Sequence, residues 1–355
     1  MMFEGESLQD LRLRDYRPRS RLRVPEHRVE RPRFPAIDAH NHLGTWLTAG
    51  LAWPDLDELS AVMDATDVRA IVNLDGRWGD ELEANLDRYD RAYPGRFATF
   101  CHLDWAEAGA PGFTERLCGS LERSAAAGAK GVKVWKDLGL HVRDDLGELL
   151  MPDDPRLSEV WTAAGALGLP VTIHVADPVA FFDPLDATNE RLEELLEHPD
   201  WWFGDRERFP TIERLVAALE SVVAAHPGTL FIGAHVGCAA EELGWVGHML
   251  ATYPNFHIDI AARIAELGRQ PRAARALIQR FPDRVLFGTD AFPPDRAIYV
   301  VHFRFLESAD EHFAYSSDEI PPQGRWAISG LDLPNDVLRA VYAENAARLI
   351  PGLSA

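Results

Sequence analysis

The chain has 355 residues, 46% hydrophobic and 26% charged, so it carries enough apolar material for a globular core. Its formal net charge of −20 argues against nucleic acid and anionic membrane surfaces as partners, because both would repel it. No apolar run suggests a signal peptide or a membrane span. Three cysteines give no disulfide framework, and we expect a cytoplasmic protein.

Residues 1–34 differ in composition from the rest of the chain. Nine arginines alternate there with six acidic residues, which is typical of a solvated segment. We interpret this segment as an N-terminal arm that wraps the body or a neighbouring subunit. The remaining residues, 35–355, are expected to form one domain. The arm and several aromatic residues lead us to expect a homo-oligomer.

Short apolar runs alternate with amphipathic segments after the arm. The runs predict eight strands, at Ala36–His40, Val68–Leu74, Phe97–Leu103, Gly131–Trp135, Pro170–Val175, Leu230–His235, Asn255–Ile260 and Arg284–Thr289. Helices are predicted between them and after the last strand, at Asp55–Thr66, Asp80–Tyr93, Phe113–Ala127, Arg156–Leu167, Thr211–Ala225, Ala239–Thr252, Arg272–Arg280 and Asn335–Leu349.

This alternation predicts a parallel sheet with right-handed crossovers. Eight repeats in a chain of this length favour an α/β protein with a (β/α)8 TIM barrel. A doubly wound sheet is the alternative, but no Gly-x-Gly-x-x-Gly motif follows the first strand.

Two connections are too long to be simple loops. They follow strands 5 and 8 and span Asp177–Pro210 and Ala291–Leu333. Barrel active sites are built at these strand ends, so we expect a distorted barrel in which aromatic residues of both connections form walls and a lid. Packing into local cores or dimer contacts is the alternative.

The first strand contains the sequence IDAHNHLG, which places Asp38, His40 and His42 on one face. Three polar residues on one face make a poor core and a good metal site. The runs PVTIHVAD, LFIGAHVG and RVLFGTD carry further candidates, and these are His174, His235 and Asp290. Such strand ends converge in a closed barrel, so the sequence predicts a metal site.

This set of residues resembles the amidohydrolase superfamily, in its amidohydrolase-related (amidohydrolase 2) branch, from about Ile37 to Leu349. The resemblance implies a distorted barrel that binds a divalent metal at its mouth. It implies ligation by His40, His42, His174 and Asp290, with His235 beside the metal. The family includes hydrolases of amides, esters and lactones, and also nonoxidative decarboxylases.

Imidazoles and a carboxylate suit zinc, with manganese or another divalent ion as alternatives. A bound cation would activate water at neutral pH. Asp290 would accept the proton of that water, and His235 would polarise a substrate carbonyl. We interpret Asp38 as a residue that orients a ligand imidazole, with direct ligation as the alternative.

The fourth strand reads KGVKVWKDLG and raises the question of a second metal ion. Elsewhere in the superfamily a carboxylated lysine on this strand bridges two metals, and Lys133 lies at the matching position. We expect one ion, as is usual in this branch, and two only if Lys133 is carboxylated. Otherwise Lys133 pairs with a carboxylate or binds an anionic substrate.

Three further residues are candidates for contact with a small-molecule substrate. Arg263 and Arg77 follow predicted strands, and an arginine at a barrel mouth can hold a carboxylate bidentately. Surface salt bridges are the alternative for both. Trp46 is the third candidate. Cys238 is interpreted as a buried thiol rather than a ligand.

The leading hypothesis is a metal-dependent hydrolase that cleaves a C–N or C–O bond of a small molecule with activated water. The alternative is a metal-dependent nonoxidative decarboxylase of an aromatic or unsaturated carboxylic acid, a lyase that would use the same ligands. An arginine that clamps a carboxylate beside the metal would favour the decarboxylase. A purely structural metal site is disfavoured, because such sites are usually closed by four ligands and often by cysteines.

Overall fold

The structure, a computed structural model, describes residues 10–12, 15–47, 50 and 55–355. Within these ranges eight parallel strands form two sheets, ordered β1-β2-β3 and β4-β5-β6-β7-β8. The strands are β1 (Ala36–Asn41), β2 (Val68–Asn73), β3 (Phe97–Thr99), β4 (Val132–Val134), β5 (Val171–Ile173), β6 (Phe231–Gly233), β7 (Phe256–Asp259) and β8 (Val285–Leu286). All eight predicted strands are confirmed, although most are shorter than predicted.

Backbone hydrogen bonds join the two sheets on both sides. Between β3 and β4, the Cys101 N–H donates to the Gly131 carbonyl oxygen at 2.9 Å. Between β1 and the end of β8, the Ala39 N–H donates to the Phe287 carbonyl oxygen, also at 2.9 Å. The strands therefore follow one another around a single (β/α)8 TIM barrel, which confirms the predicted fold class.

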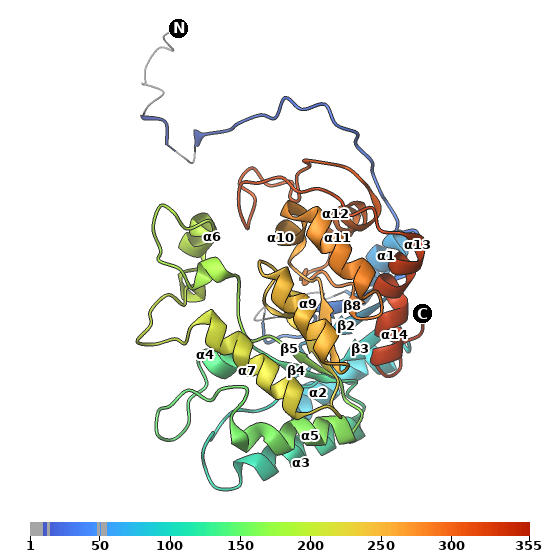
Figure 1. The fold of residues 1–355 in the computed structure, drawn as a ribbon. Helices are drawn as coiled ribbons and strands as arrows, with labels where there is room; N and C mark the ends of the chain where they lie inside the picture. The colour runs from blue at the N-terminus through green and yellow to red at the C-terminus, as the bar shows by residue number, and fades with distance from the viewer. Residues whose placement is uncertain (1–9, 13–14, 48–49, 51–54) are drawn as a thin grey trace.

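Helices surround the strands on the outside (Figure 1). They are α1 (Leu56–Thr66), α2 (Gly79–Leu86), α3 (Phe113–Ala127), α5 (Ser158–Ala166), α7 (Ile212–Ala225), α9 (Leu243–Thr252) and α11 (Pro271–Arg280). The chain ends with α13 (Asn335–Arg339), the π-helical turn η7 (Ala340–Glu344) and α14 (Asn345–Leu349). The predicted helices are confirmed. In the described part of the chain, every helix is too short or too polar to cross a membrane.

Five further helical elements in the connections that follow the strands were not predicted. They are α4 (Asp137–Leu140), α6 (Leu192–Glu197), α8 (Ala234–Gly237), α10 (Ile264–Arg269) and α12 (Arg296–Glu307). Of these, α6 and α12 lie within the two long connections. Many aromatic residues of these connections pack against one another, as Phe182 and Phe203 do at 5.5 Å between ring centroids, and form local cores. Tyr315 lines a cavity.

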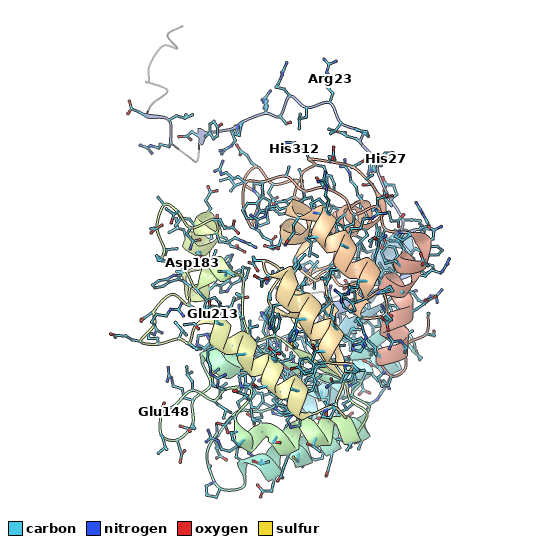
Figure 2. The ribbon with its side chains drawn as sticks, viewed as in Figure 1. Arg23, His27, Glu148, Asp183, Glu213 and His312 are labelled. Carbon is cyan, nitrogen blue, oxygen red and sulfur yellow. The ribbon has the colours of Figure 1, made fainter. Side chains whose placement is uncertain are left out.

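The N-terminal arm is extended over residues 15–34 (Figure 1). Figure 2 shows Arg23 where the arm stands away from the body and His27 where it meets the body. The His27 N–H donates to Asp310 at 2.7 Å, and the Arg33 N–H donates to Glu307 at 2.7 Å. The end of the arm is therefore held against the segment that follows β8.

The junction between β3 and β4 provides a test of this architecture. A Cβ atom at Gly131 would lie 2.4 Å from the ring of Phe100, which is fully buried. We expect Gly131→Ala to lower the free energy of unfolding by about 1–3 kcal/mol through overpacking. Urea unfolding followed by circular dichroism measures the change.

Gly119→Ala is the matched control, because Gly119 lies within α3 and only the end of the Arg123 side chain is near. This variant should gain about 1 kcal/mol of stability from helix propensity. A Gly131→Ala protein as stable as the wild type would contradict the close contact at this junction.

Candidate metal centre

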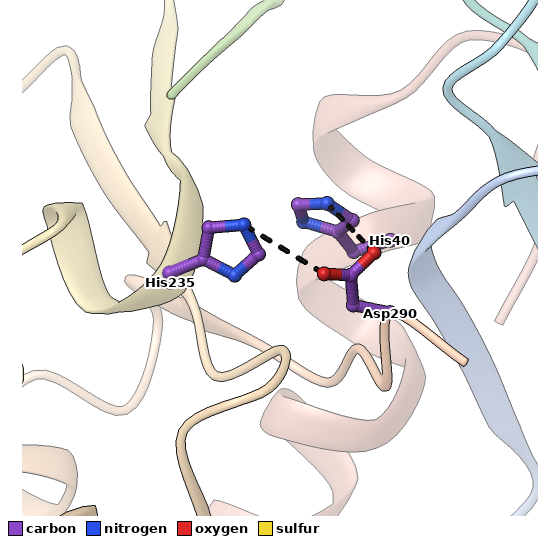
Figure 3. Close-up of side chains that lie close together, drawn as sticks. All are labelled: His40, His235 and Asp290. Carbon is purple, nitrogen blue, oxygen red and sulfur yellow. Dashed lines mark ion pairs between the residues drawn. The ribbon is translucent and has the colours of Figure 1, made fainter. Parts of the chain in front are cut away.

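Side chains from the ends of β1, β6 and β8 meet at the C-terminal end of the barrel. Asp290 Oδ1 lies 3.2 Å from His42 Nε2 and 3.7 Å from His40 Nε2, and Asp290 Oδ2 lies 3.9 Å from His235 Nε2. Figure 3 shows Asp290 between His40 and His235. The His174 ring centroid is 4.4 Å from that of His235. The structure therefore brings all five predicted residues together.

Hydrogen bonds on the far side of two imidazoles fix how they face the centre. His40 Nδ1–H donates to Asp259 Oδ2 at 2.8 Å, and His235 Nδ1–H donates to the Ala261 carbonyl oxygen at 2.9 Å. Because each ring uses its Nδ1 proton in this way, its Nε2 atom carries the lone pair that a metal needs. One ligand atom each from His40, His235 and Asp290 lies within 4.8 Å of the others.

Burial keeps the imidazoles neutral. Removal from water lowers the pKa of His40 and His235 well below the ordinary value, and it lowers the pKa of His174 to about 4. The positive charge of Lys133 lowers the pKa of His40 further. Neutral imidazole is the form that binds metal ions, so these rings are ready for ligation at neutral pH.

Several buried polar atoms at this centre have no hydrogen-bond partner among the described residues. They are His42 Nδ1, His174 Nδ1, His174 Nε2 and Asp290 Oδ1. Unpaired buried polar atoms are rare and each costs about 1–3 kcal/mol. A divalent cation that prefers nitrogen and oxygen ligands would give several of them a partner. The residues present therefore fit such an ion.

Lys133 lies inside the barrel beside these ligands. Its Nζ atom is 3.4 Å from His40 Nε2 and 5.1 Å from the ring centroid of Trp135. Burial lowers the pKa of Lys133 to about 8. Among the described residues Lys133 forms no ion pair within 4.0 Å, so the expected pairing with a carboxylate is not found there.

Asp38 takes a different place from the one we expected. The carboxylate that accepts a hydrogen bond from the His40 imidazole belongs to Asp259. Asp38 instead accepts hydrogen bonds from Thr289 and from the Tyr299 hydroxyl. Asp259 lies at the end of the seventh predicted strand, in HIDIAAR. The sequence pattern did not determine which of the two aspartates reaches the His40 imidazole.

Asp177 is a member of the centre that the sequence analysis missed. Its carboxylate lies 3.4 Å from His174 Nε2 and pairs closely with Lys136 Nζ. Burial raises the pKa of Asp177, but the neighbouring Lys136 outweighs this and holds the pKa below its ordinary value. The sequence feature that could have identified Asp177 is its position three residues after His174, in the same PVTIHVAD run.

A small cavity of about 290 Å³ adjoins the centre. Its wall includes Trp46, Arg77, Trp78, His102, Lys133 and Trp135. The Arg77 guanidinium carbon lies 4.0 Å from the centroid of Trp78 and 4.9 Å from that of Trp46. Trp46 and Arg77 therefore both lie on the wall of a cavity that adjoins the centre.

A larger cavity of about 1050 Å³ reaches the centre at Asp290. Residues of α12 and residues 26–28 of the arm form parts of its wall. Arg263 is buried at the start of α10 and donates to the Ala262 carbonyl oxygen at 2.8 Å. It lines neither this cavity nor the small one, but its charge lies close enough to the centre to lower the pKa of His235.

With this geometry established, comparison with known proteins gives the class. The family model described as Amidohydrolase matches residues 37–352. The chain belongs to the amidohydrolase family, a family of enzymes. No curated protein matches the chain.

Solved structures share the fold at low sequence identity. 2,6-Dihydroxybenzoate decarboxylase from Rhizobium is 18% identical with a TM-score of 0.57, over 89% of this chain and 98% of that chain. A TIM-barrel protein from Bordetella bronchiseptica is 14% identical with a TM-score of 0.54, over 88% and 97%. A zinc-bound amidohydrolase from Burkholderia multivorans is 16% identical with a TM-score of 0.51, over 88% and 98%. These likenesses establish the fold.

The buried imidazoles predict how metal affinity depends on pH. An imidazole with an ordinary pKa of about 6.5 loses about threefold in its neutral fraction from about pH 7 to about pH 6. Three ordinary ligands would together lose about 30-fold in zinc affinity. Burial lowers the pKa of the expected ligands His40 and His174, and of His235 beside them, so these rings stay neutral. The expected loss is therefore about threefold or less. Competition with a chromophoric chelator measures the affinity, and a loss near 30-fold would contradict this prediction.

Proposed function

We propose that the protein is a metal-dependent hydrolase that cleaves a C–N or C–O bond of a small molecule with water as the nucleophile. The observation that supports it best is the convergence of His40, His42, His235 and Asp290 beside a cavity, with buried ligand atoms left unpaired. Neutral imidazoles with one carboxylate favour zinc as the ion.

The proposed ligands are His40, His42, His174 and Asp290. His235 lies beside these ligands, with its Nε2 atom 3.9 Å from Asp290 Oδ2, and would stay free of the ion. A bound zinc ion supplies Lewis acidity, which polarises a substrate carbonyl and makes water more acidic. One ion is proposed, because the Lys133 ammonium already faces His40 and would repel a second cation.

The side chains of the chain itself would move the protons. Asp290 Oδ1 has no hydrogen-bond partner among the described residues, although His42 Nε2 lies 3.2 Å away. It would accept the proton of the attacking water. His235 Nε2 carries a lone pair and lies 3.9 Å from Asp290 Oδ2. It would receive that proton and pass it to the leaving group, while its Nδ1–H stays on Ala261.

A decarboxylase is the second candidate, and the small cavity favours it. Arg77 and Lys133 place two cationic groups on a wall that also includes Trp46 and Trp135. Such a wall suits a planar carboxylic acid, since arginine binds carboxylates bidentately and tryptophan stacks on flat rings. The neighbour from Rhizobium is a decarboxylase of this kind by name, which supports the candidate only by analogy of fold.

Metal content tests both candidates. We expect the purified wild type to hold about one zinc equivalent, measured by inductively coupled plasma mass spectrometry. His40→Ala and Asp290→Asn should each abolish activity, because they remove a ligand or the proton acceptor, and should reduce zinc content with modest loss of stability. His248→Ala is the control, because this exposed histidine lies outside the centre and pairs with Glu220. A wild type that holds no divalent metal, and that none activates, would overturn both candidates.

The reaction type is tested by the fate of the substrate atoms. Hydrolysis of an ester, amide or lactone panel in ¹⁸O-labelled water should place ¹⁸O in the product, whereas decarboxylation of benzoate or 2-hydroxybenzoate should release carbon dioxide. For any carboxylate substrate, Arg77→Gln should raise KM about 10- to 100-fold by loss of a charged hydrogen bond. Arg77→Lys is the matched variant, which keeps the positive charge but cannot bind a carboxylate bidentately. Carbon dioxide release without ¹⁸O incorporation would favour the decarboxylase.

A further inference from the structure

We infer that Asp38 is a positioning residue for Asp290, which it holds through Thr289. The inference rests on the proposed function, in which Asp290 is a metal ligand and a proton acceptor. This role differs from our expectation that Asp38 orients an imidazole. It connects the Asp38 carboxylate, on β1, to the turn that follows β8.

The contacts of Asp38 determine what it is able to do. Its side chain is fully buried. Oδ1 accepts from the Thr289 N–H at 3.0 Å and from the His40 N–H at 3.3 Å. Oδ2 accepts from the Thr289 hydroxyl at 2.6 Å, the Tyr299 hydroxyl at 3.0 Å and Asn41 Nδ2 at 3.2 Å. A carboxylate has about four lone-pair sites, so these bonds leave none for a metal.

Asp290 needs such support because of its backbone. Its φ is +58°, the left-handed region, which is uncommon for residues other than glycine. Thr289 precedes it and is bonded to Asp38 through both its backbone N–H and its hydroxyl. The Asp290 N–H donates to the His40 carbonyl oxygen at 2.9 Å. Strand β1 therefore holds this turn at two consecutive residues.

The neighbouring glycine shows how tightly the turn lies against β1. A Cβ atom at Gly288 would come within 2.9 Å of the His40 Cβ atom. A small displacement of residues 288–290 therefore moves the Asp290 carboxylate relative to His40 and His42. The bonds from Asp38 restrict that displacement.

Tyr299 extends the network to helix α12. Its hydroxyl is bonded to Asp38, while the adjacent Ile298 and Val300 line the large cavity. Asp38 thus connects three parts of the chain that are far apart in sequence: β1, the turn after β8 and α12. Loss of any one of these bonds is expected to loosen Asp290.

The experiment compares two variants of one residue. Thr289→Val keeps the shape of the side chain and removes the hydroxyl, whereas Thr289→Ser keeps the hydroxyl. We expect Thr289→Val and Asp38→Asn to weaken zinc binding about 10- to 100-fold, the usual effect of losing a group that orients metal ligands. Thr289→Ser should stay within about twofold of the wild type, a small effect on the same scale. A chromophoric chelator measures affinity, and the visible spectrum of the cobalt-substituted protein should shift only in the weakened variants.

Two tyrosine variants separate positioning from a general loss of stability. Tyr299→Phe and Tyr342→Phe each remove a buried hydroxyl that donates to a carboxylate, but Tyr342 is bonded to Glu307, outside the metal centre. Only Tyr299→Phe should weaken zinc binding and change the cobalt spectrum.

The possible outcomes separate this inference from the proposed function. If the Asp38→Asn protein does not fold, the two Thr289 variants and the two tyrosine variants still test the positioning role. Folded Thr289→Val and Tyr299→Phe proteins with wild-type affinity and spectrum would overturn the positioning role and leave the proposed function intact. A wild type with no affinity for zinc or cobalt would overturn the proposed function, on which this role depends.

Discussion

The geometry of the metal centre depends on one backbone hydrogen bond, which the Asp290 N–H donates to the His40 carbonyl oxygen. It joins the turn after the last strand to the first strand, so it forms only when the barrel is closed. The metal centre is therefore not formed by any single segment of the chain. Its ligands come from strand ends separated by up to 250 residues, and their spacing is set by the register between β8 and β1. Conditions that open this seam are expected to release a metal before the rest of the barrel unfolds.

The same closure explains why the centre tolerates so many buried polar groups. Each imidazole removed from water costs free energy unless it is hydrogen-bonded, and His40 and His235 each have a partner on the side away from the centre. Asp290 Oδ1, which has no hydrogen-bond partner among the described residues, faces these imidazoles, so its electrostatic cost falls where a cation would relieve it. Lys133 is the exception, a buried cation beside His40, and its charge favours a single metal ion over two.

The sequence predicted the barrel and the membership of the centre because both depend on local patterns. Alternation with period two places Asp38, His40 and His42 on one face, and the carboxyl ends of parallel strands converge wherever the barrel closes. The pairing of side chains could not be predicted in the same way. Whether Asp38 or Asp259 reaches His40 depends on the register between β1, β7 and β8, which no spacing within one strand determines. Helix α12 was not predicted, although Asp295 caps it and its buried residues, Tyr299, His302, Phe303 and Leu306 among them, recur at helical spacing.

The two cavities adjoin different residues of the metal centre. The small cavity shares Lys133 with the centre, and the large one shares Asp290. The proposed function would place the scissile bond of a substrate between these two side chains, with a flat or anionic portion toward Arg77 and the remainder toward α12. The family match begins at residue 37, so Glu26, His27 and Arg28 of the arm, which line the large cavity, lie outside it. The candidate metal centre thus belongs to the part of the chain that matches the family, whereas one wall of the larger cavity includes residues that precede it.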